Sequence, residues 1–340
     1  MNEHLKPVAS SPADFATDQE VRWCPGCGDY AILKAVRTVL AEVGARRENT
    51  VFVSGIGCSS RFPYYIDTYG FHTIHGRAPA VATGMLLANP DLDVWIITGD
   101  GDGLSIGGNH LLHILRRNLN CQILLFNNET YGLTKGQYSP TSHLATRTPS
   151  SPAGSIDNPV DPARYALGCG ARFVARGVDT QVKQLVEVLK AAYHHKGASF
   201  VEIYQNCIVF NEDVFDGFTA KGNIAENQLQ LEPGSPLTYG ADHSRGLAFD
   251  LETMGIKAID MPDGDRSPAL KHDPCNYNLA SALARMENPD FPVATGVLYD
   301  NPGPVYADRP AGPDETAAKK PRKLQDVMQS EFSWRVSDQR

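Results

Sequence analysis

The sequence predicts an α/β fold, with a doubly wound and mainly parallel sheet followed by an irregular C-terminal extension. Between residues 29 and 205, short apolar runs alternate with amphipathic stretches, and most of the connections between them are short. Strands and helices that alternate in this way form a parallel sheet with helices on both faces. After about residue 225 the alternation stops, and Gly, Pro and Asp become frequent.

The first half of the sheet pattern contains two helices and two strands. Residues 29–44 carry apolar side chains at helical spacing, which predicts a helix. The apolar run at 50–55 predicts a short buried strand. A second helix is expected over 77–90, where Asn-Pro ends it, and a second strand over 93–98.

The second half continues the alternation. We expect helices over 107–118, 162–167 and 179–195, and strands over 121–127, 171–176 and 199–205. Residues 137–160 are rich in Ser, Thr and Pro and predict a long loop. A loop of that length is usually functional or mobile.

Three regions follow from these patterns. We expect an N-terminal arm over 1–20, a compact domain over 21–225 and the extension over 226–340, with a helix near 276–286 and a mobile tail after about 310. The arm is polar and lacks the apolar segment of a signal peptide. No apolar run approaches the ~18 residues of a membrane span. These features predict a cytoplasmic protein with no membrane contact.

Composition narrows the class of function. The net charge is −8, which argues against a nucleic-acid partner. The seven cysteines are an odd number in a chain without a secretory signal. This favours metal or redox chemistry over a disulfide framework.

Four predicted strands end in unusual sequences. These are GIGCSSR at 55–61, GDGDG at 99–103, NNETYG at 127–132 and QNC at 205–207. In an open α/β sheet, ligands bind beyond the carboxyl ends of the strands. We therefore expect all four segments to line one edge of the sheet.

The segments GDGDG and NNETYG together predict a metal and diphosphate site. Glycines after a strand let the backbone approach a diphosphate, and a following helix N-terminus favours the anion. Asp100 and Asn128, at neighbouring strand ends, offer the hard oxygen ligands that Mg²⁺ prefers. The alternative is two tight turns, because Asp-Gly and Asn-Asn are common turn formers.

Four cysteines fall in distinctive positions. Cys24 and Cys27 form WCPGC, whereas Cys58 and Cys207 are single cysteines at strand ends. Four thiolates can bind Zn²⁺ or a [4Fe-4S] cluster. A CxxC alone is ambiguous, and zinc is usually the commoner answer. Zinc sites, however, tend to use two local pairs, whereas here one pair joins two distant single cysteines.

These motifs resemble a known family. GDG followed by NN resembles the signature of thiamine-diphosphate enzymes, and the order of the cysteines resembles the β subunits of 2-oxoacid:ferredoxin oxidoreductases, over roughly residues 20–220. The resemblance implies the thiamine-diphosphate-binding type of sheet. It also implies Mg²⁺ on Asp100, Asn128 and the backbone carbonyl of Thr130, and one [4Fe-4S] cluster on Cys24, Cys27, Cys58 and Cys207.

The resemblance further assigns residues to the cofactor and the substrate. Asp102 is the rival carboxylate for Mg²⁺ and ranks below Asp100 on spacing. His75 would face the cofactor, although without the family a helix-capping or core histidine is the better interpretation. Lys135 and Arg61 are expected at the substrate, although a lone loop lysine is more often solvated. The thiamine diphosphate contacts are expected to be Ile56, Gly57, Cys58, Ser59, His75, Gly99, Gly101, Asp102, Gly132 and Leu133.

The implied activity is a coenzyme A-dependent oxidative decarboxylation of a 2-oxoacid, with electrons passing through the cluster to ferredoxin. We favour 2-oxoglutarate, because Lys135 offers a cation for a distal carboxylate, while pyruvate and branched 2-oxoacids stay open. The carboxylating direction uses the same groups and is equally open.

The family also implies an α subunit. It would supply the pyrimidine-binding half of the cofactor site and the coenzyme A site, contact residues 226–340 and assemble as (αβ)₂. Two other functions are kept as alternatives: a subunit of a non-redox thiamine-dependent decarboxylase or synthase, and a zinc-stabilised interaction module.

Overall fold

The computed structural model describes residues 11–261, 265–308 and 328. The chain divides into two units, Met1–Ala307 and Asp308–Arg340, and the elements below belong to the first unit except for the last residue of a short 3-10 helix. The expected tail after about residue 310 lies outside the described residues apart from residue 328, and the expected arm is described only from residue 11.

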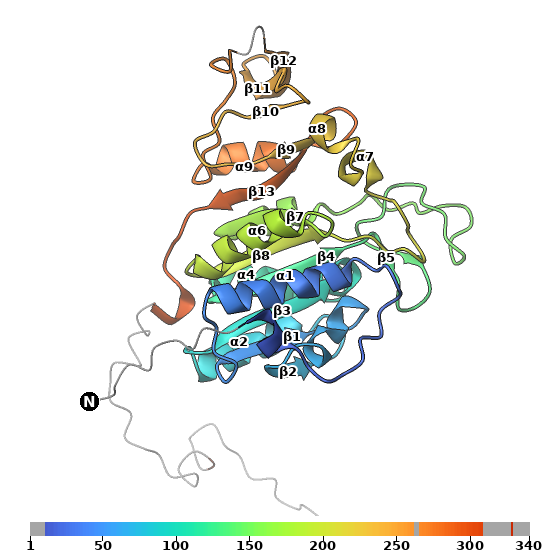
Figure 1. The fold of residues 1–340 in the computed structure, drawn as a ribbon, viewed down its shortest axis with the longest axis vertical. Coiled ribbons are helices and arrows are strands. Elements are labelled where there is room, and N and C mark those ends of the chain that lie inside the picture. The colour runs from blue at the N-terminus through green and yellow to red at the C-terminus, as the bar shows by residue number, and fades with distance from the viewer. Residues whose placement is uncertain (1–10, 262–264, 309–327, 329–340) are drawn as a thin grey trace, which may run out of the picture. The chain divides into compact units, whose positions relative to one another are not determined.

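The centre of the fold is an eight-stranded sheet with the order β2-β1-β3-β4-β8-β7-β13-β9 (Figure 1). Its strands are β1 (Thr50–Ser54), β2 (Tyr69–His72), β3 (Asp93–Gly99), β4 (Cys121–Asn127), β7 (Phe173–Val178), β8 (Ala198–Tyr204), β9 (Gln228–Gln230) and β13 (Val293–Asp300). The first six strands in this order, β2-β1-β3-β4-β8-β7, are parallel to one another. β13 runs antiparallel to β7, and β9 is parallel to β13. The prediction of a mainly parallel sheet is confirmed.

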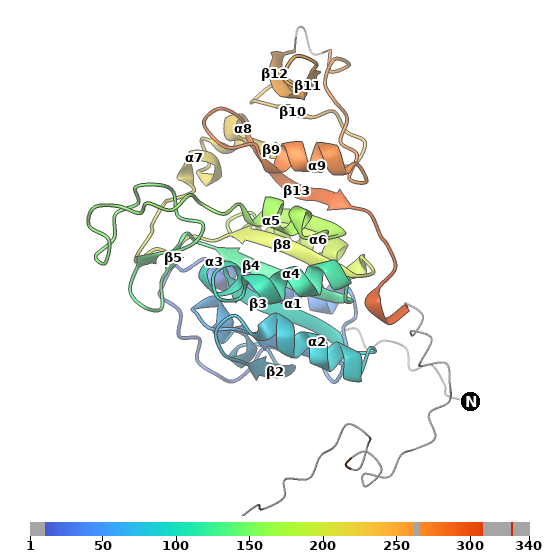
Figure 2. The same ribbon diagram turned by 180° about the vertical axis from the view of Figure 1, so that it is seen from behind.

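Helices cover both faces of this sheet, as the two opposite views show (Figures 1 and 2). The helices are α1 (Asp29–Glu42) and α6 (Val182–His194) on one face, and α2 (Ala78–Ala88), α4 (Gly108–Arg117), α5 (Pro162–Gly168) and α9 (Tyr277–Ala284) on the other. Alternate residues of β1 and β3 belong to different cores: Phe52 and Trp95 pack with the first group of helices, and Val53 and Ile96 with the second. The period of two in a strand therefore produces two apolar cores.

Short elements occupy the connections. They are η1 (Pro12–Phe15), η2 (Ser59–Tyr64), α3 (Asp100–Leu104), β5 (Thr130–Tyr131), β6 (Gln137–Tyr138), α7 (Asp216–Thr219), α8 (Ile224–Asn227) and η4 (Tyr306–Asp308). The predicted long loop over 137–160 is confirmed apart from β6. Edge strand β2 was not predicted, because all four of its residues are exposed and the segment lacks a buried apolar run.

The C-terminal extension contains more regular structure than we expected. β9 and β13 add two strands to the main sheet, and β10 (Thr238–Tyr239), β11 (Arg245–Asp250) and β12 (Gly255–Asp260) form a separate antiparallel sheet. The expected helix near 276–286 is confirmed as α9. The strand pattern of β13 is obscured by Gly296 and by a register shift between Val297 and Tyr299. Among the described residues, no helix has both the length and the apolar character to cross a bilayer.

Candidate active site

The four unusual strand ends meet at one edge of the sheet, beside the long loop drawn in green in Figure 1. Two cavities adjoin there, a strand-end cavity of about 100 Å³ and a thiol cavity of about 290 Å³. Their common wall consists of Cys58, Asn128, Gly132 and Leu133.

The strand-end cavity collects the residues that the sequence assigned to Mg²⁺ and thiamine diphosphate. All thirteen of those positions line it. The lining is Ile56, Gly57, Cys58, Ser59, His75, Gly99, Asp100, Gly101, Asp102, Phe126, Asn128, Thr130, Tyr131, Gly132, Leu133 and Thr134. Phe126, Tyr131 and Thr134 were missed, although Tyr131 and Thr134 flank the glycine and leucine that were assigned.

Asp100 is the first residue of α3, directly after β3. The hydroxyls of Ser139 and Thr141 both donate to its Oδ2, at 2.6 and 2.7 Å. Burial raises the pKa of the Asp100 carboxyl. A buried carboxylate in polar surroundings gains from a cation, so this residue suits a metal ligand.

Asp102 has a different role in the structure. Its Oδ1 accepts hydrogen bonds from the backbone N–H of Ile56 at 3.0 Å and of Gly76 at 2.7 Å, and it lies 2.6 Å from His75 Nδ1. Its Oδ2 accepts from the hydroxyl of Thr98 at 2.6 Å. The carboxylate thus holds the loop after β1 and the loop before α2 against the end of β3, which gives a physical reason to rank it below Asp100 as a metal ligand.

The two asparagines after β4 are also used differently. Asn127 is buried, donates to Glu202 Oε1 at 2.8 Å and accepts from the Thr141 hydroxyl at 2.9 Å. Asn128 lines both cavities, and its Oδ1 accepts from the backbone N–H of Thr130 at 3.2 Å. Only the second asparagine presents its amide to the strand-end cavity.

Glycines keep the strand-end cavity open. An added Cβ on Gly57, whose φ is +137°, would have no atom within 4 Å, and one on Gly99 would come no closer than 3.5 Å to another residue. A side chain at either position would therefore project into space that a ligand can fill. Gly101 is required for another reason, because its Cβ would lie 2.2 Å from the ring of Tyr131.

The thiol cavity brings together all four cysteines of the predicted cluster site. Its lining is Arg22, Trp23, Cys24, Cys27, Cys58, Arg61, Asn128, Gly132, Leu133, Lys135, Gln205, Cys207, Ile208, Val209 and Phe210. A Cβ on Gly132 would touch the sulfurs of Cys207 and Cys58 at 3.5 and 3.6 Å. The indole N–H of Trp23 donates to the backbone carbonyl of Cys58 at 2.7 Å. Trp23 and Gln205 were not predicted as site residues, although they are the first residues of the motifs WCPGC and QNC.

The four thiols of this cavity are free to bind a metal or a cluster. All four cysteines are free, and burial raises the pKa of Cys27 and raises that of Cys58 to about 12. Such thiols stay protonated until a metal displaces the proton. No three His, Cys, Asp or Glu side chains within residues 11–261, 265–308 and 328 are arranged to hold a metal ion. The four cysteines line one cavity of about 290 Å³.

The two residues expected at the substrate, Arg61 and Lys135, line the thiol cavity and not the strand-end cavity. Arg61 Nε donates to the hydroxyl of Tyr65 at 2.9 Å, so its guanidinium is partly engaged. Lys135 is exposed and has a positive φ of 77°. The lysine ammonium is therefore the freer of the two cations.

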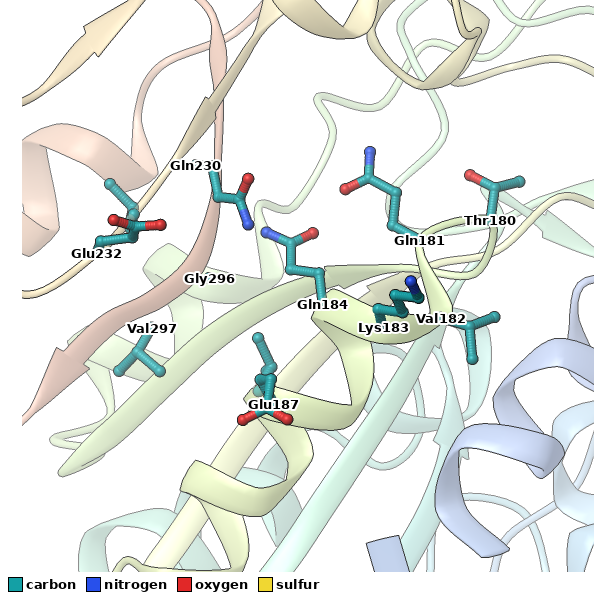
Figure 3. Close-up of a pocket in the computed structure, with 12 residues that line it drawn as sticks. Thr180, Gln181, Val182, Lys183, Gln184, Glu187, Gln230, Glu232, Gly296 and Val297 are labelled. Carbon is teal, nitrogen blue, oxygen red and sulfur yellow. The ribbon is translucent and has the colours of Figure 1, made fainter. Parts of the chain in front are cut away.

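A further cavity of about 790 Å³ lies between α6 and strands β9 and β13 (Figure 3). Gln184 in its wall donates to the hydroxyl of Thr295 at 3.0 Å, which ties α6 to β13. None of the predicted site residues lines this cavity. It is therefore separate from the strand-end and thiol cavities.

Comparisons with known proteins agree with this geometry. Residues 55–203 match the family described as "Thiamine pyrophosphate enzyme, C-terminal TPP binding domain", and thiamine pyrophosphate is the same compound as thiamine diphosphate. The chain is 49% identical over 337 residues to the 2-oxoglutarate oxidoreductase subunit KorB of Mycobacterium tuberculosis, covering 95% of this chain and 88% of that protein. It is 45% identical to subunit beta of 2-oxoacid:ferredoxin oxidoreductase 2 of Aeropyrum pernix, covering 77% and 82%.

A solved structure is similar as well. The 2-oxoglutarate:ferredoxin oxidoreductase from Magnetococcus marinus, described with 2-oxoglutarate, coenzyme A and succinyl-CoA bound, superposes with a TM-score of 0.71 at 36% identity. The match covers 89% of each chain. Shared sequence over nearly the full length and a shared fold establish the relationship. The chain belongs to the family of β subunits of 2-oxoacid:ferredoxin oxidoreductases and is the thiamine-diphosphate-binding subunit of an oxidoreductase complex.

Proposed function

We propose that this chain is the β subunit of a 2-oxoglutarate:ferredoxin oxidoreductase. The complex would convert 2-oxoglutarate and coenzyme A to succinyl-CoA and CO₂ and pass the electrons through a [4Fe-4S] cluster to ferredoxin, and it can also run in the carboxylating direction. The observation that carries the proposal is the wall that the strand-end and thiol cavities share. The names of the relatives from Mycobacterium tuberculosis and Magnetococcus marinus support 2-oxoglutarate as the substrate.

The strand-end cavity is the proposed place of the diphosphate and its Mg²⁺. Asp100, Asn128 and the backbone carbonyl of Thr130 would hold the metal, and the bare glycines Gly57 and Gly99 would admit the cofactor. When bound, thiamine diphosphate supplies the nucleophilic carbon that attacks a 2-oxo group. The residues of this chain would bind and orient it, and Leu133 and Tyr131, which line the cavity, would shield it from water. The remaining expected contacts are Ile56, Cys58, Ser59, His75, Gly101, Asp102 and Gly132.

The thiol cavity is the proposed place of the cluster. Cys24, Cys27, Cys58 and Cys207 would be its ligands. Because Cys58 also lines the strand-end cavity, a cluster there would lie next to the cofactor. Short separation favours one-electron transfer between the two groups, which a non-redox thiamine enzyme would not need.

A partner must complete the site. Small-molecule pockets usually enclose ~300–1,000 Å³, and the strand-end cavity is only about 100 Å³. We therefore propose an α subunit that supplies the pyrimidine-binding half and the coenzyme A site, in an (αβ)₂ assembly contacted by the C-terminal extension. Free cysteines throughout the described chain suit a reducing compartment such as the cytoplasm.

The substrate residues are Lys135 and Arg61 in this proposal. A distal carboxylate distinguishes 2-oxoglutarate from pyruvate and branched 2-oxoacids, and the exposed Lys135 offers a charge for it. Arg61, already bonded to Tyr65, would support the same end of the substrate.

The proposal is tested on the anaerobically purified chain, alone and with its α subunit. We expect the chain alone to be brown from an iron–sulfur absorbance band but inactive, and the complex to reduce ferredoxin only with coenzyme A and with 2-oxoglutarate at the highest kcat/KM. Activity of the isolated chain would contradict the need for a partner. A colourless chain that releases CO₂ would indicate the non-redox thiamine enzyme, and a colourless chain that holds zinc would indicate the interaction module.

A further inference from the structure

Gln205 lies between the two proposed metal sites. It is the first residue after β8, is 1% exposed, and its backbone N–H donates to the carbonyl of Asn127 at 2.9 Å. Its side-chain Oε1 accepts from Asn128 Nδ2 at 2.7 Å. Its Nε2 lies 2.5 Å from the carbonyl oxygen of Asn206 and 3.4 Å from the sulfur of Cys27. One buried amide therefore contacts both a proposed Mg²⁺ ligand and a proposed cluster ligand.

These contacts determine which way two amides face. The carbonyl of Asn206 can only accept, so it must meet the NH₂ end of Gln205. The oxygen of Gln205 then faces Asn128, and because that oxygen can only accept, it meets the NH₂ end of Asn128. The Asn128 oxygen is left on the side of Thr130, where a metal ligand needs an oxygen and not a nitrogen.

The other end of the Gln205 amide acts on sulfur. An N–H that donates to a cluster thiolate stabilises the more negative, reduced cluster and so raises its reduction potential. The distance of 3.4 Å between Nε2 and the Cys27 sulfur is within the range of such a bond. Loss of this donor is expected to lower the potential.

We propose that Gln205 is a positioning residue that couples the Mg²⁺–diphosphate site to the cluster. The inference rests on the proposed function, since it requires both groups to bind as described above. A cation on the Asn128 oxygen polarises that amide and strengthens its bond to Gln205. The polarised Gln205 amide in turn donates more strongly to Cys27, as in other chains of hydrogen bonds.

Coupling of this kind is reciprocal. If bound Mg²⁺–thiamine diphosphate favours the reduced cluster, then the reduced cluster must favour bound Mg²⁺–thiamine diphosphate by the same factor. We expect Gln205 to contribute about tenfold to that factor, which for a one-electron couple corresponds to about 59 mV.

The alternative is that Gln205 only fills space and holds the end of β8. Three variants separate these roles. Gln205→Met keeps the side-chain length and removes the side-chain hydrogen bonds to Asn128, Asn206 and Cys27. Gln205→Glu keeps an acceptor for Asn128 and removes the donor to Cys27 and Asn206. Gln184→Met is the matched control, because this partly buried amide donates to the hydroxyl of Thr295 and lines the separate cavity of Figure 3.

The experiment is a redox titration of the complex, followed by electron paramagnetic resonance with and without Mg²⁺ and thiamine diphosphate. The signal of this chain's cluster is the one that a Cys24→Ala variant lacks. We expect the change in potential on loading to be about 59 mV more positive in the wild type than in Gln205→Met. Gln205→Glu should keep the cofactor affinity of the oxidised enzyme and lose the coupling, and Gln184→Met should behave as the wild type.

Equal changes in potential in the wild type and in both Gln205 variants would overturn the inference, as would variants that lower only the melting temperature. A wild type that holds no cluster, or that binds no thiamine diphosphate, would instead refute the proposed function. If the wild type holds both groups but the Gln205 variants show the same change in potential on loading, only the coupling is refuted.

Discussion

At the scale of single residues, closely similar side chains have separate tasks. The buried carboxylate of Asp100 accepts hydrogen bonds from two side-chain hydroxyls. The carboxylate of Asp102 instead accepts from the backbone N–H groups of Ile56 and Gly76. Spacing in the sequence could rank the two aspartates, but only the contacts explain the ranking. The role of Gln205 also becomes visible only from its contacts, because the sequence motif QNC points to its cysteine and not to its glutamine.

The cysteines give the sharpest residue-scale prediction. The Cys207→Ala protein should contain much less iron than the wild type and show little of the associated absorbance, because three thiolates hold a cubane cluster poorly. Cys275→Ala is the control, since that exposed thiol donates only to the Asp300 carbonyl and lines neither cavity of the site. Iron analysis of both anaerobic proteins measures the effect. Equal iron in the two variants would show that Cys207 is not a ligand.

At the scale of elements, the extension shows what sequence patterns conceal. Strands β1, β3, β4 and β8 were predictable because each is a continuous apolar run followed by a distinctive motif. β13 was not, since Gly296 and the register shift after Val297 interrupt its pattern, and its partners β7 and β9 lie far away in sequence. The convergence of the strand ends followed from topology, whereas the amide contacts of Gln205 depend on side-chain packing that no spacing encodes.

Gly296 is the expected weak point of β13. Its φ is +106°, and an added Cβ would lie 3.0 Å from the carbonyl oxygen of Leu231. Gly296→Ala should therefore lower the free energy of unfolding by about 1–3 kcal/mol. Gly84→Ala in α2, where a Cβ has open space, should instead raise it by up to about 1 kcal/mol. Denaturant titrations of both variants test this, and a stabilised Gly296→Ala would contradict it.

A histidine in the extension predicts a dependence on pH. His272 is buried, its Nε2 lies 2.8 Å from the carbonyl oxygen of Val297 in β13, and burial lowers its pKa. The unfolded chain therefore binds this proton more readily than the folded chain, so His272 costs stability as the pH falls below the unfolded pKa of about 6.5.

His272→Gln should remove that loss and keep a donor for Val297. Melting temperatures of the two proteins should diverge as the pH falls from 7.5 to 5, with the wild type falling faster. Parallel curves over this range would contradict the prediction, because they would mean that the folded and unfolded chains bind this proton equally well.

At the scale of the whole molecule, ligand binding and stability are linked. A ligand that binds only the folded state at about 100 times its Kd adds about 2.7 kcal/mol to the free energy of unfolding. Mg²⁺ with thiamine diphosphate should therefore raise the melting temperature of the complex, and a chelator should reverse the rise.

Asp100→Asn identifies the origin of that effect. This variant should respond to thiamine diphosphate weakly and to Mg²⁺ not at all, because the carboxylate ligand is gone. Its melting temperature without ligands should be no lower than that of the wild type, since burial disfavours the charged carboxylate. If Mg²⁺ raises the melting temperature of Asp100→Asn as much as that of the wild type, then Asp100 is not the metal ligand.

The wall between the strand-end and thiol cavities has one more consequence. At Gly132 the wall is main chain alone, and an added Cβ there would meet the sulfurs of Cys207 and Cys58. At this position the wall has no side chain, so its thickness there does not depend on a rotamer. In the proposed enzyme, electron transfer past Gly132 would therefore require no side-chain movement at that residue.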